Sequence, residues 1–170
     1  MSSEVHYYED FLAPGLCDWF MSFHDVYYPL YGVPFSDRRS LNLANTAEKI
    51  YIDEAHTSAD TLKYVMSCMT DAVKKHDDKA YINYAHVVRW PAPIEQPIHQ
   101  DFYYHAWTSV LYLNDDFEGG CTWVEGEKIK PKKGDMILFQ GRYLKHGVMP
   151  VTKGHRYTIT AWYKAWGNDY

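Results

Sequence analysis

Two histidines of this chain are each followed two residues later by an aspartate. One pair is His76 and Asp78, and the other is His99 and Asp101. The chain has nine histidines and 22 acidic residues, so such a pair is weak support for a site by itself. His76 closes an amphipathic helical pattern, where a solvated helix end explains it. His99 lies in a β-like pattern, in which residues i and i+2 share a face, so His99 and Asp101 can bind one metal ion.

A metal ion held by His99 and Asp101 needs a third protein ligand. His146, at the start of another β-like run, is the best candidate, although an ordinary strand or loop histidine is the alternative. Two histidines and one carboxylate on one face of an octahedron leave three coordination positions open. This donor set is typical of non-haem Fe(II) oxygenases.

An arginine ten residues after His146 indicates an anion-binding position. In the β-like run that follows it, one face holds Arg156, Thr158, Thr160 and Trp162. A buried arginine is costly unless it meets an anion, and a guanidinium can bind a carboxylate through two parallel hydrogen bonds. Thr108 and Tyr112 share one face of a nearby run, and the Tyr112 phenol can share that carboxylate. The alternative is that Arg156 pairs with an internal Asp or Glu.

The elements that must position these residues change character near residue 80. Residues 14–23 and 58–75 show helical spacing, whereas residues 27–47 are aromatic, punctuated by Pro and Gly, and predict a long loop. From residue 80 onward the hydrophobic period becomes two. The expected strands are 81–90, 97–104, 107–114, 121–125, 135–140, 146–151 and 155–166. Many short strands at regular spacing favour a sandwich or barrel.

Length and composition restrict the class of protein. We expect one domain over residues 1–170, with helical support and a loop at 1–79 and a β core at 80–166. The net charge of −5 argues against a dedicated nucleic-acid partner. No 18-residue apolar run or signal layout is visible, so no membrane partner is expected. The three cysteines lie far apart and predict neither disulfides nor a zinc site, which favours a cytoplasmic location. The oligomeric state is left open.

Taken together, these motifs resemble the catalytic core of the Fe(II)/2-oxoglutarate-dependent dioxygenases, specifically their prolyl 4-hydroxylase-like branch. The matching segments are HQD at 99–101, TSVLYLNDDFEGGCTWV at 108–124, IKPKKGDMILF at 129–139 and LKHGVMPVTKGHRYTITAWY at 144–163. The segment YYEDFLAPGLCDWF near the start is similar to that branch's opening strand and helix. One departure is RWPAP at 89–93, where the family often has a Tyr-Pro-Gly segment before its His-x-Asp.

The resemblance implies an α+β fold with a double-stranded β-helix core, which is a jelly roll of the cupin type, supported by N-terminal helices. It implies iron ligation by His99, Asp101 and His146. It further implies O2 as a cosubstrate, with ascorbate as an optional accessory. The expected reaction is hydroxylation of a substrate C–H bond, in a prolyl residue of a peptide or protein, with release of succinate and CO2.

The resemblance also implies a site for the cosubstrate 2-oxoglutarate. Arg156 would bind its distal carboxylate, helped by Tyr112 and Thr160, and Trp162 would line the cavity. We place Thr108, which shares the face of Tyr112, in the same pocket.

Two other readings of the sequence stay open. The first is the same chemistry on a free amino acid, another small molecule or an alkylated base. Repair enzymes of the last kind typically carry a second arginine shortly after the cosubstrate arginine, which RYTITAWY lacks. The second is a cupin-like module that binds a metal or ligand without turnover. The aromatic loop at 27–39 either covers the mouth of the barrel or packs in the core; its residues in question are Tyr27, Tyr28, Tyr31, Phe35, Arg38 and Arg39.

Overall fold

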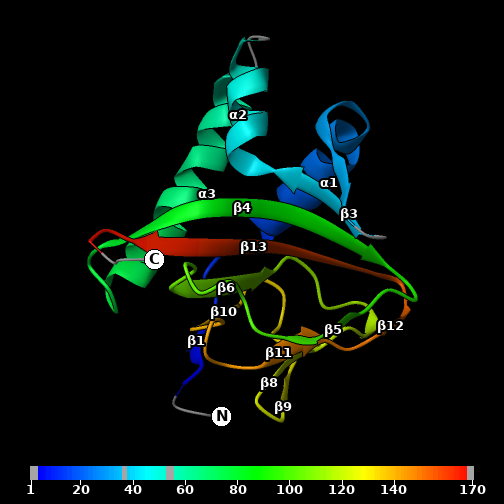
Figure 1. Ribbon diagram of the computed structural model, residues 1–170. Coiled ribbons are helices and arrows are strands. Elements are labelled where there is room, and N and C mark those ends of the chain that lie inside the picture. Colours follow the sequence, from blue (N-terminus) through cyan, green and yellow to red (C-terminus); the bar gives the residue numbers. More distant parts are fainter. Residues whose placement is uncertain (1–3, 36–37, 53–55, 168–170) are drawn as a thin grey trace.

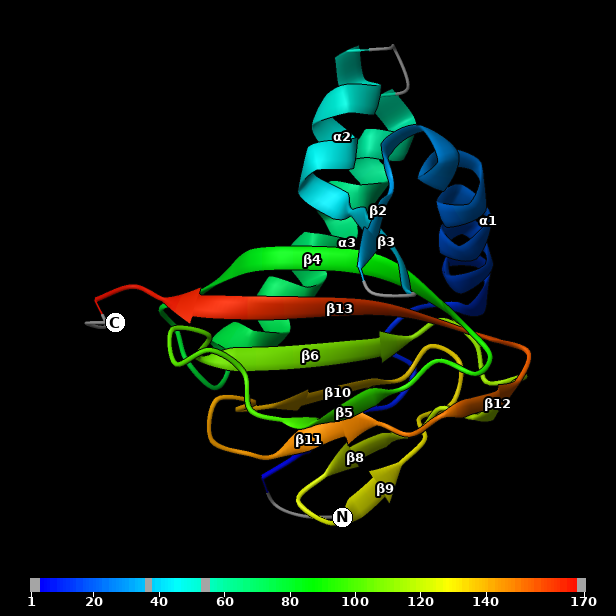
Figure 2. The ribbon, with the colours of Figure 1, turned by 45° about the vertical axis from the view of Figure 1, so that its right-hand side comes forward.

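Two β-sheets face each other, and helices cover the outer face of the larger sheet (Figures 1 and 2). The computed structural model describes residues 4–35, 38–52 and 56–167. Its helices are α1 (Pro14–Tyr31), α2 (Leu43–Ile52) and α3 (His56–Lys74). The helix expected from residue 58 is therefore confirmed as α3. Within the described residues, no helix is long and apolar enough to span a membrane.

The larger sheet has the strand order β1-β10-β6-β13-β4-β3-β2, with antiparallel pairing throughout. Its strands are β1 (His6–Tyr8), β10 (Met136–Phe139), β6 (Trp107–Tyr112), β13 (His155–Ala165), β4 (Ala80–Pro91), β3 (Arg38–Asn42) and β2 (Val33–Phe35). The long strands β4 and β13 pair along almost their whole length. They form the platform on which both the helices and the second sheet are placed.

The smaller sheet lies under the large one in Figure 2 and has the order β5-β11-β8-β9. Its strands are β5 (Gln96–His99), β11 (His146–Val148), β8 (Thr122–Val124) and β9 (Glu127–Ile129). A further pair joins β12 (Val151–Lys153) to β7 (Glu118–Gly119). This is the jelly-roll core with supporting helices that we expected from the sequence.

Side chains along β13 alternate between the helix-side face and the small-sheet face of the large sheet. The side chains of Tyr157, Ile159, Ala161 and Tyr163 are buried in the core that α1, α2 and α3 form with the large sheet. Arg156 and Thr158 are buried as well but belong to the opposite face of the strand, because neighbouring residues of a strand point in opposite directions. That face looks toward the small sheet, where a pocket for polar ligands can be built.

The prediction of a long loop at residues 27–47 is wrong. Helix α1 continues to Tyr31, a β2–β3 hairpin follows, and α2 buries Leu43 and Ile50. Aromatic rings four residues apart favour the longer helix: Phe23 contacts Tyr27, and Tyr27 stacks on Tyr31. Strand β3 exists because it pairs with β4, a contact between distant residues that local punctuation does not reveal. The side chain of Phe35 lies outside the described residues.

Most of the expected strands are shorter than predicted, and two of them differ most. Strand β5 ends at His99, because the amide of Asp101 turns away to donate to the carbonyl of Gly141. The run expected at 146–151 is split into β11 and β12, with Met149 and Pro150 between them. Strand β1 overlaps the opening strand that the resemblance implied, whereas the short strands β2, β3, β7 and β9 were not expected. The support expected over residues 1–79 therefore contains strands β1, β2 and β3 besides its helices.

Candidate metal centre and cosubstrate pocket

The structure brings together the three residues expected to hold a metal ion. His99 and His146 are directly opposite each other on β5 and β11 of the small sheet. The Nε2 atoms of the two rings lie 3.4 Å and 3.2 Å, respectively, from Oδ1 of Asp101. One ligand atom from each residue lies within 4.8 Å of the others. These distances allow one ion to contact all three.

The hydrogen bonds of the two histidines are those expected of metal ligands. In both rings Nδ1 lies 2.8 Å from a backbone carbonyl two residues upstream, that of Pro97 for His99 and that of Leu144 for His146. A carbonyl only accepts, so Nδ1 must carry the proton and a neutral ring has its lone pair on Nε2. Both lone pairs then point at a carboxylate, an arrangement that a cation between the three groups satisfies.

Asp101 is held by groups on both sides of its carboxylate. The hydroxyl of Thr108 donates to Oδ2, which leaves Oδ1 directed at the histidines. Burial by itself raises the pKa of Asp101, but its interactions with His146, His99 and Thr108 overcome that effect and hold the pKa well below its usual range. The residue is therefore a carboxylate, as a metal ligand must be.

A glycine permits this close packing around Asp101. A Cβ on Gly141 would lie 2.2 Å from Oδ2 of Asp101 and 2.7 Å from the hydroxyl oxygen of Thr108. The same glycine accepts the backbone hydrogen bond from Asp101 at 3.0 Å. A side chain at position 141 would displace the carboxylate from the two histidines.

A second polar group lies on the inner face of the large sheet. Arg156 is 1% exposed, and its Nη2 donates to the hydroxyls of Tyr112 at 3.1 Å and Thr122 at 3.3 Å. Its guanidinium lies against two aromatic rings, 4.8 Å from the ring centroid of Trp90 and 4.9 Å from that of Tyr112. The cation is thus fixed in direction before any ligand arrives.

The pairing of Arg156 with an internal acid, which the sequence left open, is absent from the described residues. No described Asp or Glu forms an ion pair with its guanidinium, and Nε has no hydrogen-bond partner. A buried cation with a free donor is costly unless an anion accompanies it. The surroundings of Arg156 therefore fit the carboxylate of a bound acid.

The remaining predicted residues are distributed between these two groups. Thr108 contacts Asp101 and not Arg156, so the structure places it at the metal centre. Trp162 is the cross-strand partner of Thr108 and adjoins that centre. Thr160 lies on β13 between Arg156 and Trp162. Its hydroxyl oxygen is 3.4 Å from that of Thr158, and it forms no hydrogen bond to Arg156 among the described contacts.

Sequence reasoning missed Thr122, which contacts both Arg156 and Tyr112. Thr122 lies on β8, where it shares a face with Val124 of the buried cluster under the large sheet. The alternation of Thr122 with the buried Val124 could have indicated that its side chain is also buried. Its partner Arg156, however, lies 34 residues further along the chain, so local sequence patterns do not connect the two.

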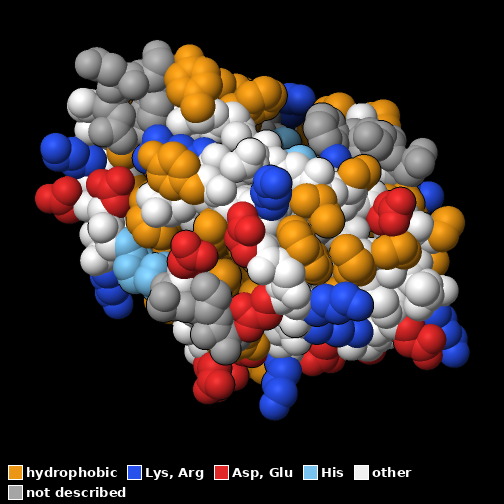
Figure 3. All heavy atoms as spheres, turned by 60° about the horizontal axis from the view of Figure 1, so that its bottom comes forward, with side chains coloured by type: hydrophobic (Ala, Val, Ile, Leu, Met, Phe, Trp, Pro, Cys, Tyr) orange, Lys and Arg blue, Asp and Glu red, His pale blue; other side chains and the backbone are white. Residues whose placement is uncertain are grey.

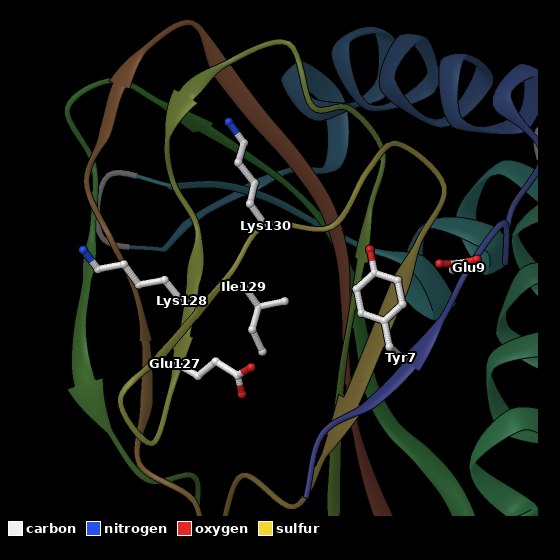
Figure 4. Close-up of a pocket in the computed structure, with 6 residues that line it drawn as sticks. All are labelled: Tyr7, Glu9, Glu127, Lys128, Ile129 and Lys130. Carbon is white, nitrogen blue, oxygen red and sulfur yellow. The ribbon is translucent and has the colours of Figure 1, made fainter. Parts of the chain in front are cut away.

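A separate open pocket lies between the edge strands of the two sheets, β1 and β9 (Figure 4). Its lining residues are Tyr7, Glu9, Glu127, Lys128, Ile129 and Lys130. None of the predicted site residues lines it. On the face shown in Figure 3, acidic and basic side chains are intermixed with hydrophobic ones, which differs from the single-sign basic surface of a nucleic-acid binder.

With this geometry established, comparison with known proteins identifies the family. The sequence pattern described as the 2OG-Fe(II) oxygenase superfamily matches residues 63–164, which include every predicted metal and cosubstrate residue. The chain belongs to this superfamily. The superfamily is named for oxygenases that combine Fe(II) with 2-oxoglutarate.

Among curated proteins, the chain is similar to human prolyl 3-hydroxylase 2, with 41% identity over 68 residues. That match covers 35% of this chain but only 10% of the human protein. The chain thus spans about a tenth of the length of the curated relatives it matches.

Solved structures share the fold over nearly the whole chain. A viral collagen prolyl hydroxylase from Paramecium Bursaria Chlorella virus-1, in a 2OG complex, matches with a TM-score of 0.68, 19% identity and coverage of 96% of this chain and 97% of that one. A Trichoplax adhaerens prolyl hydroxylase, in complex with a hypoxia inducible factor peptide fragment, matches with a TM-score of 0.73 and 17% identity, covering 96% and 84%. At these identities the likeness establishes the fold.

Proposed function

We propose that this oxygenase hydroxylates a prolyl residue in a peptide or protein, with His99, Asp101 and His146 holding Fe(II) and Arg156 binding the distal carboxylate of 2-oxoglutarate. The observation that carries the site assignment is the pairing of two incomplete groups on facing sheets. One is a set of three donors that requires a cation, and the other is a buried cation that requires an anion. A metal ion and a dicarboxylic 2-oxo acid supply both.

In this mechanism the protein's own residues bind and orient. Fe(II) with 2-oxoglutarate would supply the oxidative chemistry, in which one atom of O2 would enter succinate as CO2 is released and the other would become the hydroxyl oxygen of the substrate. The backbone carbonyls of Pro97 and Leu144 hold the histidines in the Nε2-ligating tautomer, and Thr108 holds the carboxylate. Arg156 would fix the far end of the cosubstrate, so that its other end faces the metal. No side chain needs to act as a general acid or base.

A continuous set of aromatic rings supports an extended substrate. This aromatic strip consists of Trp162, His105, Phe102 and Tyr84. His105 contacts each of the other three rings at centroid distances of 6.2 to 6.3 Å. The strip begins at Trp162, beside the metal centre, and ends at the surface, where Phe102 is 67% exposed and Tyr84 49%.

Such a strip suits a proline-containing chain better than a free amino acid. Extended polyproline-like segments are already stiff, so they can stack on aromatic rings at low entropic cost. A single amino acid would be enclosed near the metal and would leave Phe102 and Tyr84 without a role. The names of the relatives, which are prolyl hydroxylases, agree with this substrate class.

The decisive experiment incubates the protein with Fe(II), 2-oxoglutarate and O2, together with prolyl peptides of about four and ten residues, and in parallel with free proline. We expect stimulated succinate formation and a peptide mass increase of one oxygen atom. Stimulation by free proline alone would assign the same chemistry to a small molecule. Formation of succinate with none of these substrates accepted would overturn the prolyl assignment and leave the oxygenase assignment intact.

A further inference from the structure

Two buried nitrogen atoms in the cosubstrate pocket have no hydrogen-bond partner in the described structure: Nε1 of Trp90 and Nε of Arg156. The side chains of Trp90 and Arg156 are 3% and 1% exposed, so water does not satisfy these groups freely. Two other described side chains, Arg89 and Arg142, also carry a buried unpaired nitrogen. Trp90 and Arg156 differ from them because they contact each other.

The two side chains lie on the pocket face of the large sheet. Trp90 on β4 and Arg156 on β13 are cross-strand partners, so their side chains point to the same side. Trp90 packs in one cluster with Val148 of the small sheet, which places its ring between the two sheets. The indole centroid is 4.8 Å from the guanidinium carbon. Both unpaired N–H groups therefore belong to one small region.

The chemistry of the two groups indicates what they would bind. An indole nitrogen is only a donor, and so is every nitrogen of a guanidinium, so neither can satisfy the other. The Nη2 of Arg156 is engaged with Tyr112 and Thr122, and its Nε is not. A planar anion with two oxygen atoms accepts from two such donors at once. A carboxylate has this form.

We propose that Trp90 is a cosubstrate-binding residue whose indole N–H donates to the same carboxylate of 2-oxoglutarate that Arg156 binds. Trp90 thereby adds a directional donor to a site in which Arg156 provides the charge. Its ring also covers one face of the guanidinium and limits the directions from which a carboxylate can approach. The distal carboxylate of 2-oxoglutarate is then bound by residues of two strands, β4 and β13.

The test uses Trp90→Phe, which keeps an aromatic ring against Arg156 and removes the N–H. Binding of 2-oxoglutarate is measured by calorimetry on protein loaded with Zn(II), which accepts the same ligand types and has no redox chemistry. We expect the variant to bind 2-oxoglutarate roughly ten- to a hundredfold more weakly, the loss expected for one hydrogen bond to a charged group. Binding of 2-oxobutyrate, which lacks the second carboxylate, should be equal in variant and wild type.

Trp107→Phe is the matched control, because Trp107 is a buried tryptophan of the same sheet that belongs to the helix-side core. It should leave the affinity for 2-oxoglutarate unchanged. The proposal is overturned if Trp90→Phe binds 2-oxoglutarate as tightly as wild type, or if it loses affinity equally for 2-oxobutyrate. The proposal rests on the proposed placement of 2-oxoglutarate at Arg156, but no prolyl substrate is used, so its outcome does not depend on the prolyl assignment.

A measurement on the wild-type protein covers the case in which Trp90→Phe does not fold. The chain has six tryptophans, so six indole N–H resonances are expected in a nitrogen-correlated NMR spectrum. Addition of 2-oxoglutarate to the Zn(II)-loaded protein should shift the Trp90 indole resonance downfield, as a new hydrogen bond does, and 2-oxobutyrate should not. An unmoved Trp90 resonance at saturating 2-oxoglutarate would refute the proposal.

Discussion

At the scale of single residues, the proposed metal centre depends on backbone carbonyls as much as on side chains. The carbonyls of Pro97 and Leu144 fix which nitrogen of each histidine is available. Gly141 contributes by lacking a side chain where Asp101 and Thr108 approach each other. These contacts distinguish the proposed metal-binding motif His99-Gln100-Asp101 from the similar motif His76-Asp77-Asp78.

Removal of any one metal ligand should abolish iron-dependent turnover. His99→Ala, Asp101→Ala and His146→Ala each leave two ligands, which hold Fe(II) far more weakly than three. The measurement is 2-oxoglutarate consumption, together with metal content after desalting and circular dichroism to verify folding. His76→Ala is the control and should retain full activity, because its ring is exposed and instead contacts Tyr8 and His6. Equal losses at His76 and His99 would contradict the assignment.

Removal of the Arg156 guanidinium should weaken the binding of 2-oxoglutarate by roughly 2–5 kcal/mol, because a buried carboxylate loses its charged partner. Arg156→Lys should recover only part of the affinity, since an ammonium is a point charge that cannot reproduce the planar fork. Calorimetric titration of Arg156→Ala and Arg156→Lys checks both statements. Unchanged affinity in Arg156→Ala would show that the carboxylate binds elsewhere.

Metal affinity should fall as the pH is lowered. The hydrogen bond to Asp101, followed by the bond to the carbonyl of Pro97, raises the pKa of His99 above its ordinary value. A raised pKa means that the ring stays protonated to higher pH, and a proton on Nε2 excludes the metal. We therefore expect weakening to begin above about pH 6.5, the usual histidine value. Zinc titrations between about pH 8 and pH 5.5 measure it, and a flat profile would contradict this account.

At the scale of elements, the sequence predicted β13 well, because its alternation is long and consistent. It also predicted α3 and the strands that carry His146 and Tyr112. It failed at residues 27–47, where prolines and glycines suggested a loop although ring stacking extends α1 and β3 pairs with β4. It could not place Thr122 or Trp90 beside Arg156, because those contacts arise only when distant strands meet.

The outer end of the aromatic strip is expected to contact only the longer substrates. Phe102 is exposed at the outer end of the aromatic strip, so Phe102→Ala should raise the KM for a ten-residue prolyl peptide several-fold and leave the KM for a four-residue peptide nearly unchanged. Tyr84→Ala should act in the same direction.

The control for this prediction is Tyr64→Ala. Tyr64 is an aromatic residue of similar exposure, 60%, but lies on α3 and takes no part in the strip. It should have no effect on either peptide. Identical kinetics for wild type and Phe102→Ala with the long peptide would show that the strip does not bind substrate.

At the scale of the whole molecule, the two layers carry different halves of the site. The three proposed metal ligands come from β5, β11 and the turn after β5, all on the small-sheet side. Arg156, Tyr112 and Trp90 come from the large sheet. Few direct polar bonds join the halves: Thr108 bonds to Asp101, and Arg156 and Tyr112 bond to Thr122.

This division between layers has a consequence for folding stability. A cosubstrate that contacts the metal at one end and Arg156 at the other would cross-link the two sheets non-covalently, so each ligand should strengthen the effect of the other on the melting temperature. Zn(II) and 2-oxoglutarate added together should raise it by more than the sum of their separate shifts, because each ligand stabilises the folded state that it binds and also increases the affinity for the other. Differential scanning fluorimetry measures all four conditions. Arg156→Ala should reduce the response to Zn(II) plus 2-oxoglutarate to that of Zn(II) alone, and a simple sum of shifts in the wild type would show that the layers respond independently.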